Sequence, residues 1–137
     1  MSTLDTLDHK EYGFEKQEVE EGGDGKTYTV KAKTISKVLQ SLTDALSKAG
    51  VTPSQVINGA KSYQTILFKL PSGELIQIGK SWKYPSTYLI FPISSSEFDT
   101  TATWIKQAND KADTKARAKV ILASNGFSQE DIKRILP

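Results

Sequence analysis

The chain has 137 residues, no cysteine and a formal net charge of +2 at pH 7. This length suits one domain that buries a sizeable core without help from a metal or a disulfide. The lack of cysteine excludes disulfides, thiolate nucleophiles and cysteine-ligated metals. No apolar run approaches the roughly 20 residues of a membrane helix, and the N-terminus lacks the features of a signal peptide. We therefore expect a cytoplasmic protein that does not enter a membrane.

The charges are unevenly distributed along the chain. Residues 1–24 contain eight acidic and two basic side chains, whereas the rest of the chain contains eight acidic and 16 basic ones. We predict an acidic, flexible N-terminal arm over residues 1–25, with Tyr12 and Phe14 as its docking contacts, and an α+β domain over residues 26–137. An acidic arm beside a basic body can fold over the basic surface and compete with an anionic ligand.

Two segments have the patterns of β-strands. Residues 27–33 alternate between apolar and polar side chains, as a half-exposed strand does. Residues 63–93 contain three runs rich in β-branched and aromatic residues, which are separated by Pro71-Ser-Gly73 and Pro85-Ser86. These segments predict an antiparallel sheet of three to four strands.

Alternation along the strands assigns side chains to the two faces of this sheet. The predicted core face carries Ile66, Phe68, Leu70, Ile76, Ile78, Leu89, Phe91 and Ile93. The predicted outer face is mixed in polarity and carries Tyr63, Thr65, Leu67, Lys69, Leu75, Gln77, Tyr88 and Ile90.

Helical patterns surround the strands. Residues 34–49 form an apolar stripe at helical spacing, and Gly50 is typical of a helix C-terminus. Thr52-Pro53 then predicts a second short helix that ends near Asn58-Gly59. Residues 99–136 predict further helices and a corner at Gly126. Residues 100–125 form either one helix or two, and the capping residues Asp113 and Thr114 favour two. The fold class is therefore α+β, a single small domain with helices packed on one face of the sheet and a C-terminal helical corner.

The sequence offers little for catalysis. His9 is the single histidine and lies near Asp5, Asp8 and Glu11, but a flexible arm cannot hold a metal geometry. The carboxylate pairs Glu97/Asp99 and Asp110/Asp113 are better explained as helix caps or solvated groups. We therefore predict a non-enzymatic protein with no catalytic residue, no metal and no cofactor.

Basic and aromatic residues occur together around the predicted sheet. Aromatic rings stack on bases and lysines contact phosphates, so this combination favours nucleic acid, and single strands in particular. The predicted nucleic-acid-binding residues are Lys61, Tyr63, Lys69, Lys80, Trp82, Lys83, Tyr84 and Tyr88. The alternative is that Trp82 and Tyr84 fold back onto the sheet and that the lysines only solvate it.

A protein partner is the competing prediction. In this reading the chain is an interaction, assembly or inhibitor factor whose outer sheet face packs on another chain through Tyr63, Leu67, Leu75, Tyr88 and Ile90. The position of Trp82 distinguishes the two, because an exposed ring beside lysines favours nucleic acid and a buried ring favours neither. The sequence predicts neither the partner's identity nor the oligomeric state.

Overall fold

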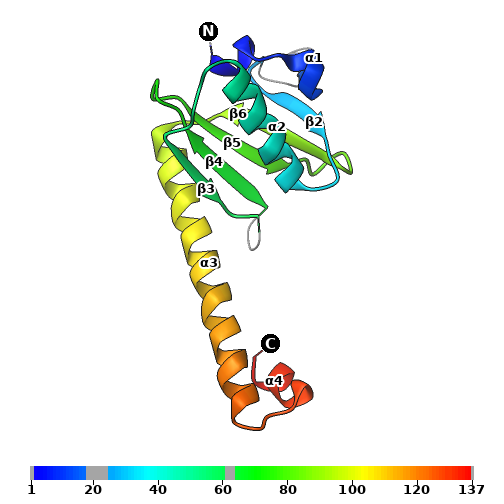
Figure 1. Cartoon of the computed structure of the whole chain (residues 1–137), viewed down its shortest axis with the longest axis vertical. Helices are drawn as coiled ribbons and strands as arrows, with labels where there is room; N and C mark the ends of the chain where they lie inside the picture. Colours follow the sequence, from blue (N-terminus) through cyan, green and yellow to red (C-terminus); the bar gives the residue numbers. More distant parts are fainter. Residues whose placement is uncertain (1, 18–24, 61–63, 137) are drawn as a thin grey trace.

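A computed structural model describes residues 2–17, 25–60 and 64–136 of the chain. The described part is a small α+β domain built on one antiparallel sheet (Figure 1), as predicted. The strands are β1 (Glu15–Lys16), β2 (Tyr28–Lys31), β3 (Gln55–Asn58), β4 (Thr65–Lys69), β5 (Leu75–Lys80) and β6 (Thr87–Pro92). The helical elements are η1 (Thr3–Thr6), α1 (His9–Tyr12), α2 (Ile35–Lys48), α3 (Ser95–Ser124) and α4 (Gln129–Ile135).

The sheet has six strands in the order β1-β2-β6-β5-β4-β3, so the predicted number of three to four is wrong. One additional strand is β3, which replaces the short helix predicted after Thr52. Val56 of β3 lies opposite Phe68 of β4, and the Ser54 amide donates to the Lys69 carbonyl at 2.8 Å. Pairing with the free edge of β4 thus satisfies the backbone groups of residues 55–58. These hydrogen bonds outweigh the preference of the Thr52-Pro53 capping pattern for a helix. The other additional strand is β1, which pairs with β2.

Helix α2 covers one face of the sheet (Figure 1). It begins at the N-cap Thr34, whose side chain accepts from the Lys37 amide, and it ends before Gly50, whose φ of 76° is in the left-handed region. This confirms the helix predicted over residues 34–49. Its buried stripe packs on a core that includes Tyr28, Val30, Ile66, Phe68, Ile76, Ile78, Tyr88 and Ile90.

The register of β6 differs from the prediction. Ile90 lies between Ile78 of β5 and Tyr28 of β2, so Tyr88 and Ile90 share the face that α2 covers. Leu89 and Phe91 lie on the opposite face, and their assignment to the same face as Ile66 is wrong. Because β6 carries apolar residues at consecutive positions, its pattern does not distinguish the two faces.

The first turns of α3 cover the second face of the sheet, so the predicted arrangement with helices on one face is wrong. Leu67 of β4 is 0% exposed and packs with Phe98 and Ile105 of α3. Leu75 and Ile93 lie at the margin of this second core. The part of the mixed outer face around Leu67 is therefore a buried helix–sheet interface, whereas Gln77, Leu89 and Phe91 on the same face are half-buried.

Helix α3 is continuous over 30 residues, and the predicted break at Asp113 or Thr114 is wrong. The Thr114 hydroxyl donates to the Asp110 carbonyl within the helix at 2.9 Å instead of capping a new helix. The helix stands away from the sheet beyond its first turns, and α4 packs back against its far end (Figure 1). Gly126, with a φ of 88°, forms the predicted corner between the two helices.

Residues 2–17 pack against the body of the domain, although the sequence predicts a flexible arm for residues 1–25. Leu4, Leu7 and Phe14 are buried in the core beneath α2. The Glu74 carboxylate accepts from the Thr3 amide at 2.9 Å, and Lys48 forms ion pairs with Asp8 and Glu11. Residues 18–24 of the predicted arm lie outside the described residues.

Acidification is expected to destabilise this docked segment. The Tyr28 hydroxyl donates to Asp5 and lowers the pKa of that carboxyl. Burial raises the pKa of Glu74, but hydrogen bonds from Thr3 and Ser2 outweigh it and bring the pKa below its usual 4.5. A carboxyl group whose pKa is lower in the folded than in the unfolded state stabilises the fold. This contribution is complete at pH values above the unfolded-state pKa, and it is lost as the pH falls through the folded-state pKa. The stability should therefore decrease below about pH 4.5.

Urea unfolding at a series of pH values measures this effect. The double variant Asp5→Asn/Glu74→Gln lacks both carboxylates and should show a clearly flatter decline between about pH 5 and pH 3 than the wild type. Equal declines in the two proteins would contradict the assignment.

Candidate nucleic-acid interface

One end of the sheet brings together the β5–β6 loop, the end of β2 and the start of α2. Lys31 of β2 lies opposite Thr87, and Lys80 of β5 lies opposite Tyr88. The Ala32 amide donates to the Ser86 carbonyl at 3.0 Å, which places residues 31–33 beside the loop. This antiparallel pairing joins two lysine-containing segments that are distant in the sequence.

Trp82 projects from this loop and is 93% exposed. The loop has a hydrogen-bonded frame, because the Ser81 hydroxyl accepts from the amides of Lys83 and Tyr84, both at 3.2 Å. The Ser81 amide in turn donates to the Thr87 carbonyl at 2.9 Å. The Trp82 ring therefore does not fold back onto the sheet.

Tyr84 lies beside Trp82 and is 56% exposed. The Nζ atom of Lys83 lies 5.4 Å from the centroid of the Tyr84 ring, within the range of a cation–π contact. We call Lys31, Lys33, Lys80 and Lys83 the lysine cluster; all four side chains are exposed at this end of the sheet. Glu15 of β1 is a nearby carboxylate and lines a depression together with Lys31.

The remaining predicted site residues lie elsewhere. Lys69 is exposed at the opposite end of the sheet, since it pairs with Leu75 at the start of β5. Tyr88 is buried beneath α2 and cannot stack on a base. Lys61 and Tyr63 lie outside the described residues. The structure therefore brings together Lys80, Trp82, Lys83 and Tyr84, and it adds Lys31 and Lys33, which sequence reasoning placed on a strand but not in the site.

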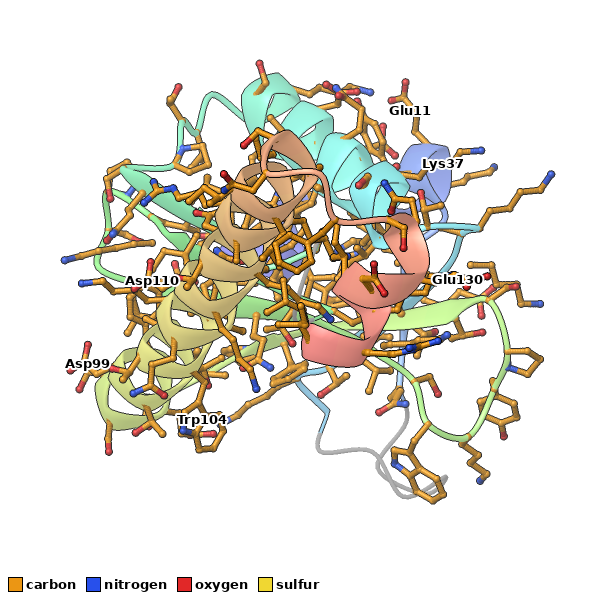
Figure 2. The ribbon with its side chains drawn as sticks, turned by 90° about the horizontal axis from the view of Figure 1, so that it is seen from below. Glu11, Lys37, Asp99, Trp104, Asp110 and Glu130 are labelled. Atoms are coloured by element: carbon orange, nitrogen blue, oxygen red, sulfur yellow. The ribbon has the colours of Figure 1, made fainter. Side chains whose placement is uncertain are left out.

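The side chains predicted for the outer sheet face do not form one surface, because the structure divides them between the two faces and buries three of the five. Tyr88 and Ile90 lie beneath α2, and Leu67 lies beneath α3. Exposed apolar side chains occur instead along α3 and α4, namely Trp104, Val120, Ile121, Phe127 and Ile135. Figure 2 shows Asp99 and Trp104 on the outward side of α3 and Glu130 on α4.

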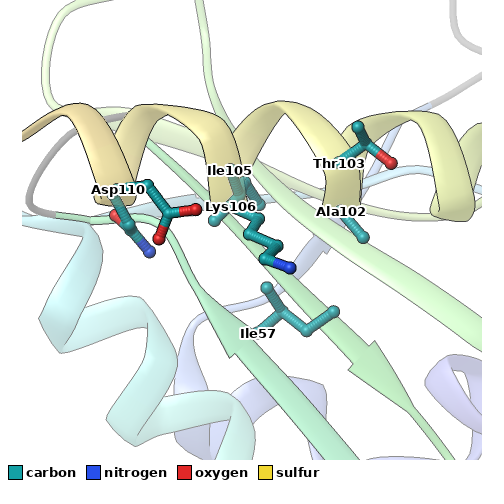
Figure 3. A pocket seen from close by; sticks show the side chains of 7 residues that line it. Ile57, Ala102, Thr103, Ile105, Lys106 and Asp110 are labelled. Carbon is teal, nitrogen blue, oxygen red and sulfur yellow. The ribbon is translucent and has the colours of Figure 1, made fainter.

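An open depression of about 450 Å³ lies between α3 and β3. Figure 3 shows Lys106 extending from α3 toward Ile57 of β3, with Ala102 and Asp110 along the same wall. This wall is largely apolar, and Lys106 and Asp110 are its charged side chains.

The other titratable residues considered for chemistry have structural contacts. Glu97 forms the capping box of α3 with Ser94, and the His9 ring donates to the Leu4 carbonyl. Within the described ranges, no group of three or more histidine, aspartate or glutamate side chains could hold a metal ion.

No protein-family model matches the chain, and neither a curated protein nor a solved structure matches it. The helices in the described part of the chain include none that is long and apolar enough to cross a membrane. The functional argument therefore depends on the surface chemistry of the domain.

Proposed function

We propose that the chain is a non-enzymatic protein that binds single-stranded nucleic acid through the Trp82 loop and the lysine cluster. The observation that carries this proposal is the exposed Trp82 ring beside Lys83 on a hydrogen-bonded loop. Stacking of a base on such a ring contributes about 1–3 kcal/mol and depends little on the base, because every base has a flat face.

The lysine cluster supplies the complementary charge. Lysines that meet phosphates release condensed counterions, so the affinity should fall as the salt concentration rises. Lysine acts as a point charge and lacks the bidentate geometry with which arginine recognises particular bases. The composition of the surface therefore favours weak binding with little sequence preference.

Replacing Trp82 is the direct test. Trp82→Ala should weaken binding of a labelled oligo(dT) by about 1–3 kcal/mol, measured by fluorescence anisotropy. Lys83→Gln should mainly flatten the dependence of affinity on salt, by about one unit of the log–log slope. Trp104→Ala is the matched control, because it removes the same side chain from α3, away from the lysine cluster. Absence of salt-dependent binding by the wild type at low ionic strength would contradict the proposal.

A protein partner is a second candidate, and it is supported by a different surface from the predicted outer sheet face. Val120 and Ile121 on α3 and Phe127 at the corner are exposed together near the far end of the helix. Clustered apolar side chains of this kind commonly mark interfaces. Binding of a protein partner at this surface should be weakened by Ile121→Ser or Phe127→Ser and unaffected by Trp82→Ala. Nucleic-acid binding should show the opposite pattern, so these variants distinguish the two functions.

A further inference from the structure

Strand β3 forms an open edge of the sheet. It is the last strand in the order β1-β2-β6-β5-β4-β3, and no segment of the described ranges pairs with its outer side. Its residues Gln55–Asn58 carry no charge, whereas β1 at the other edge consists of Glu15 and Lys16 only. Short length and charged side chains protect an edge from a further strand. The β3 edge is therefore the less protected of the two.

The pairing with β4 determines which backbone groups of β3 are free. The Gly59 amide donates to the Thr65 carbonyl at 2.9 Å, so the backbone of Gly59 points toward β4. Residues that point toward a neighbouring strand alternate with residues that point away from it, so Ile57 also points toward β4. The amides and carbonyls of Val56 and Asn58 point the other way, toward the open edge.

Apolar side chains lie on both faces of this edge. Val56 lies opposite Phe68, on the face that α2 covers, and it is 45% exposed. Ile57 lies opposite Leu67, on the face that α3 covers, and it is half-buried in the depression of about 450 Å³ between α3 and β3 (Figure 3). A further strand along the edge would remove the exposed surface of Val56 and Ile57 from water, which is favourable. The depression would accept an apolar side chain of that strand.

The charges beside the edge indicate a second feature of such a strand. Lys69 lies opposite Gln55 and is exposed on the same face of the sheet as Ile57. Lys106 of α3 extends toward Ile57 from the other side of the depression (Figure 3). Asp110 is the acidic residue of this lining, so the two lysines leave an excess of positive charge. This excess favours an acidic side chain next to the apolar one.

We propose that the open edge of β3 binds an extended acidic segment of a partner protein as a further strand of the sheet. The backbone of the segment pairs with Val56 and Asn58, an apolar side chain enters the depression between α3 and β3, and an acidic side chain lies beside Lys106. Addition of a strand derives affinity from the backbone hydrogen bonds and specificity from the side-chain pockets. This interaction goes beyond the proposed function, because it uses neither the Trp82 loop nor the lysine cluster.

Hydrogen–deuterium exchange measured by NMR tests the edge directly. The probe is a peptide of about six residues, the length of an ordinary strand, in which valines alternate with threonine and glutamate. In the free protein the amides of Val56 and Asn58 should exchange faster than that of Ile57, and the peptide should slow both. The control peptide carries N-methyl groups on two adjacent residues. These methyl groups block both edges of the peptide, so the control should leave the exchange unchanged.

Substitutions separate the backbone contact from the side-chain contacts. Val56→Pro removes an amide that points away from β4, and it should weaken peptide binding about tenfold in fluorescence anisotropy. Ala102→Leu fills the depression without changing the edge and should weaken binding as well. Lys106→Glu should weaken binding of the glutamate peptide and strengthen binding of a peptide with lysine at those positions. Lys111→Glu makes the same change on α3 outside this depression and is the control.

The outcomes distinguish this interaction from the alternatives. Slower exchange at Val56 and Asn58, lost with the methylated peptide and in Ala102→Leu, supports the proposal. Absence of binding, or binding that is equal for the glutamate and lysine peptides, would overturn it. Slow exchange of Val56 and Asn58 in the free protein that is lost on dilution would assign the edge to a second copy of the chain and would also overturn it. Oligonucleotide binding through Trp82 should be the same in all these variants of β3 and α3, so the proposed function stands or fails separately.

Discussion

Deletion of residues 2–14 is expected to abolish cooperative folding of the chain. This segment contributes the buried side chains of Leu4, Leu7 and Phe14 to the core beneath α2. Truncating one large buried side chain commonly costs about 2–5 kcal/mol, and a domain of this size has only about 5–15 kcal/mol of stability in total. Losing three such side chains together with the Glu74 hydrogen bonds should therefore remove most of that stability.

Near-ultraviolet circular dichroism and urea unfolding measure the effect. The truncated chain should lose the fixed aromatic signal, and Leu4→Ala should lower the urea midpoint clearly. Lys10→Ala changes an exposed residue of the same segment and should leave the midpoint almost unchanged. A truncated protein with a wild-type midpoint would show that the segment is not part of the core.

The contacts of this segment also bear on the idea of an acidic arm that competes with an anionic ligand. Asp8 and Glu11 pair with Lys48 at the C-terminal end of α2, whereas the lysine cluster lies at the N-terminal end of that helix. Asp5 interacts with Lys16 and Tyr28. Asp5, Asp8 and Glu11 therefore contact the domain away from the lysine cluster, whereas Glu15 lines a depression together with Lys31 of that cluster.

Elements with strong local patterns could be predicted from the sequence. Helix α2 combines an apolar stripe, the N-cap Thr34 and the glycine at position 50, and all three signals lie within the element itself. The corner at Gly126 is equally local, because Ser128 starts α4 with a capping box. In both cases tertiary contacts and local preferences favour the same structure.

Elements decided by distant contacts could not be predicted in this way. Residues 55–58 follow a capping pattern, but the free edge of β4 makes them a strand. The face of Ile90 follows from its pairing with Ile78 and Tyr28 and not from the apolar pattern of β6 itself. The N-terminal segment is acidic and short of apolar residues, yet Leu4, Leu7 and Phe14 are buried in the core.

The candidate site also has one part that a local sequence pattern indicates and another part that depends on distant contacts. Residues 80–84 are consecutive, so their basic and aromatic character is visible in the sequence. Lys31 and Lys33 join them only because β2 pairs with β6, which no local pattern shows.

Ile105→Ala is expected to destabilise the domain by about 2–5 kcal/mol. Ile105 is 0% exposed and fills the space between α3 and Leu67 of β4, where the second core is small. Few neighbours can move into the cavity that the substitution leaves, because the sheet beneath it is fixed by pairing on both sides of β4. The loss should therefore lie within this range even though alanine favours the helix more than isoleucine does.

Ile121→Ala is the matched control, since it makes the same change in the same helix at a side chain that is 59% exposed. The free energy of unfolding of Ile121→Ala, measured by urea denaturation, should stay within about 0.5 kcal/mol of the wild-type value. A large loss at both positions would mean that the far end of α3 is packed in solution, against a second copy of the chain or another part of it. A loss at Ile105 alone shows that the first turns of α3 hold the helix on the sheet, while Ile121 stays exposed for a partner.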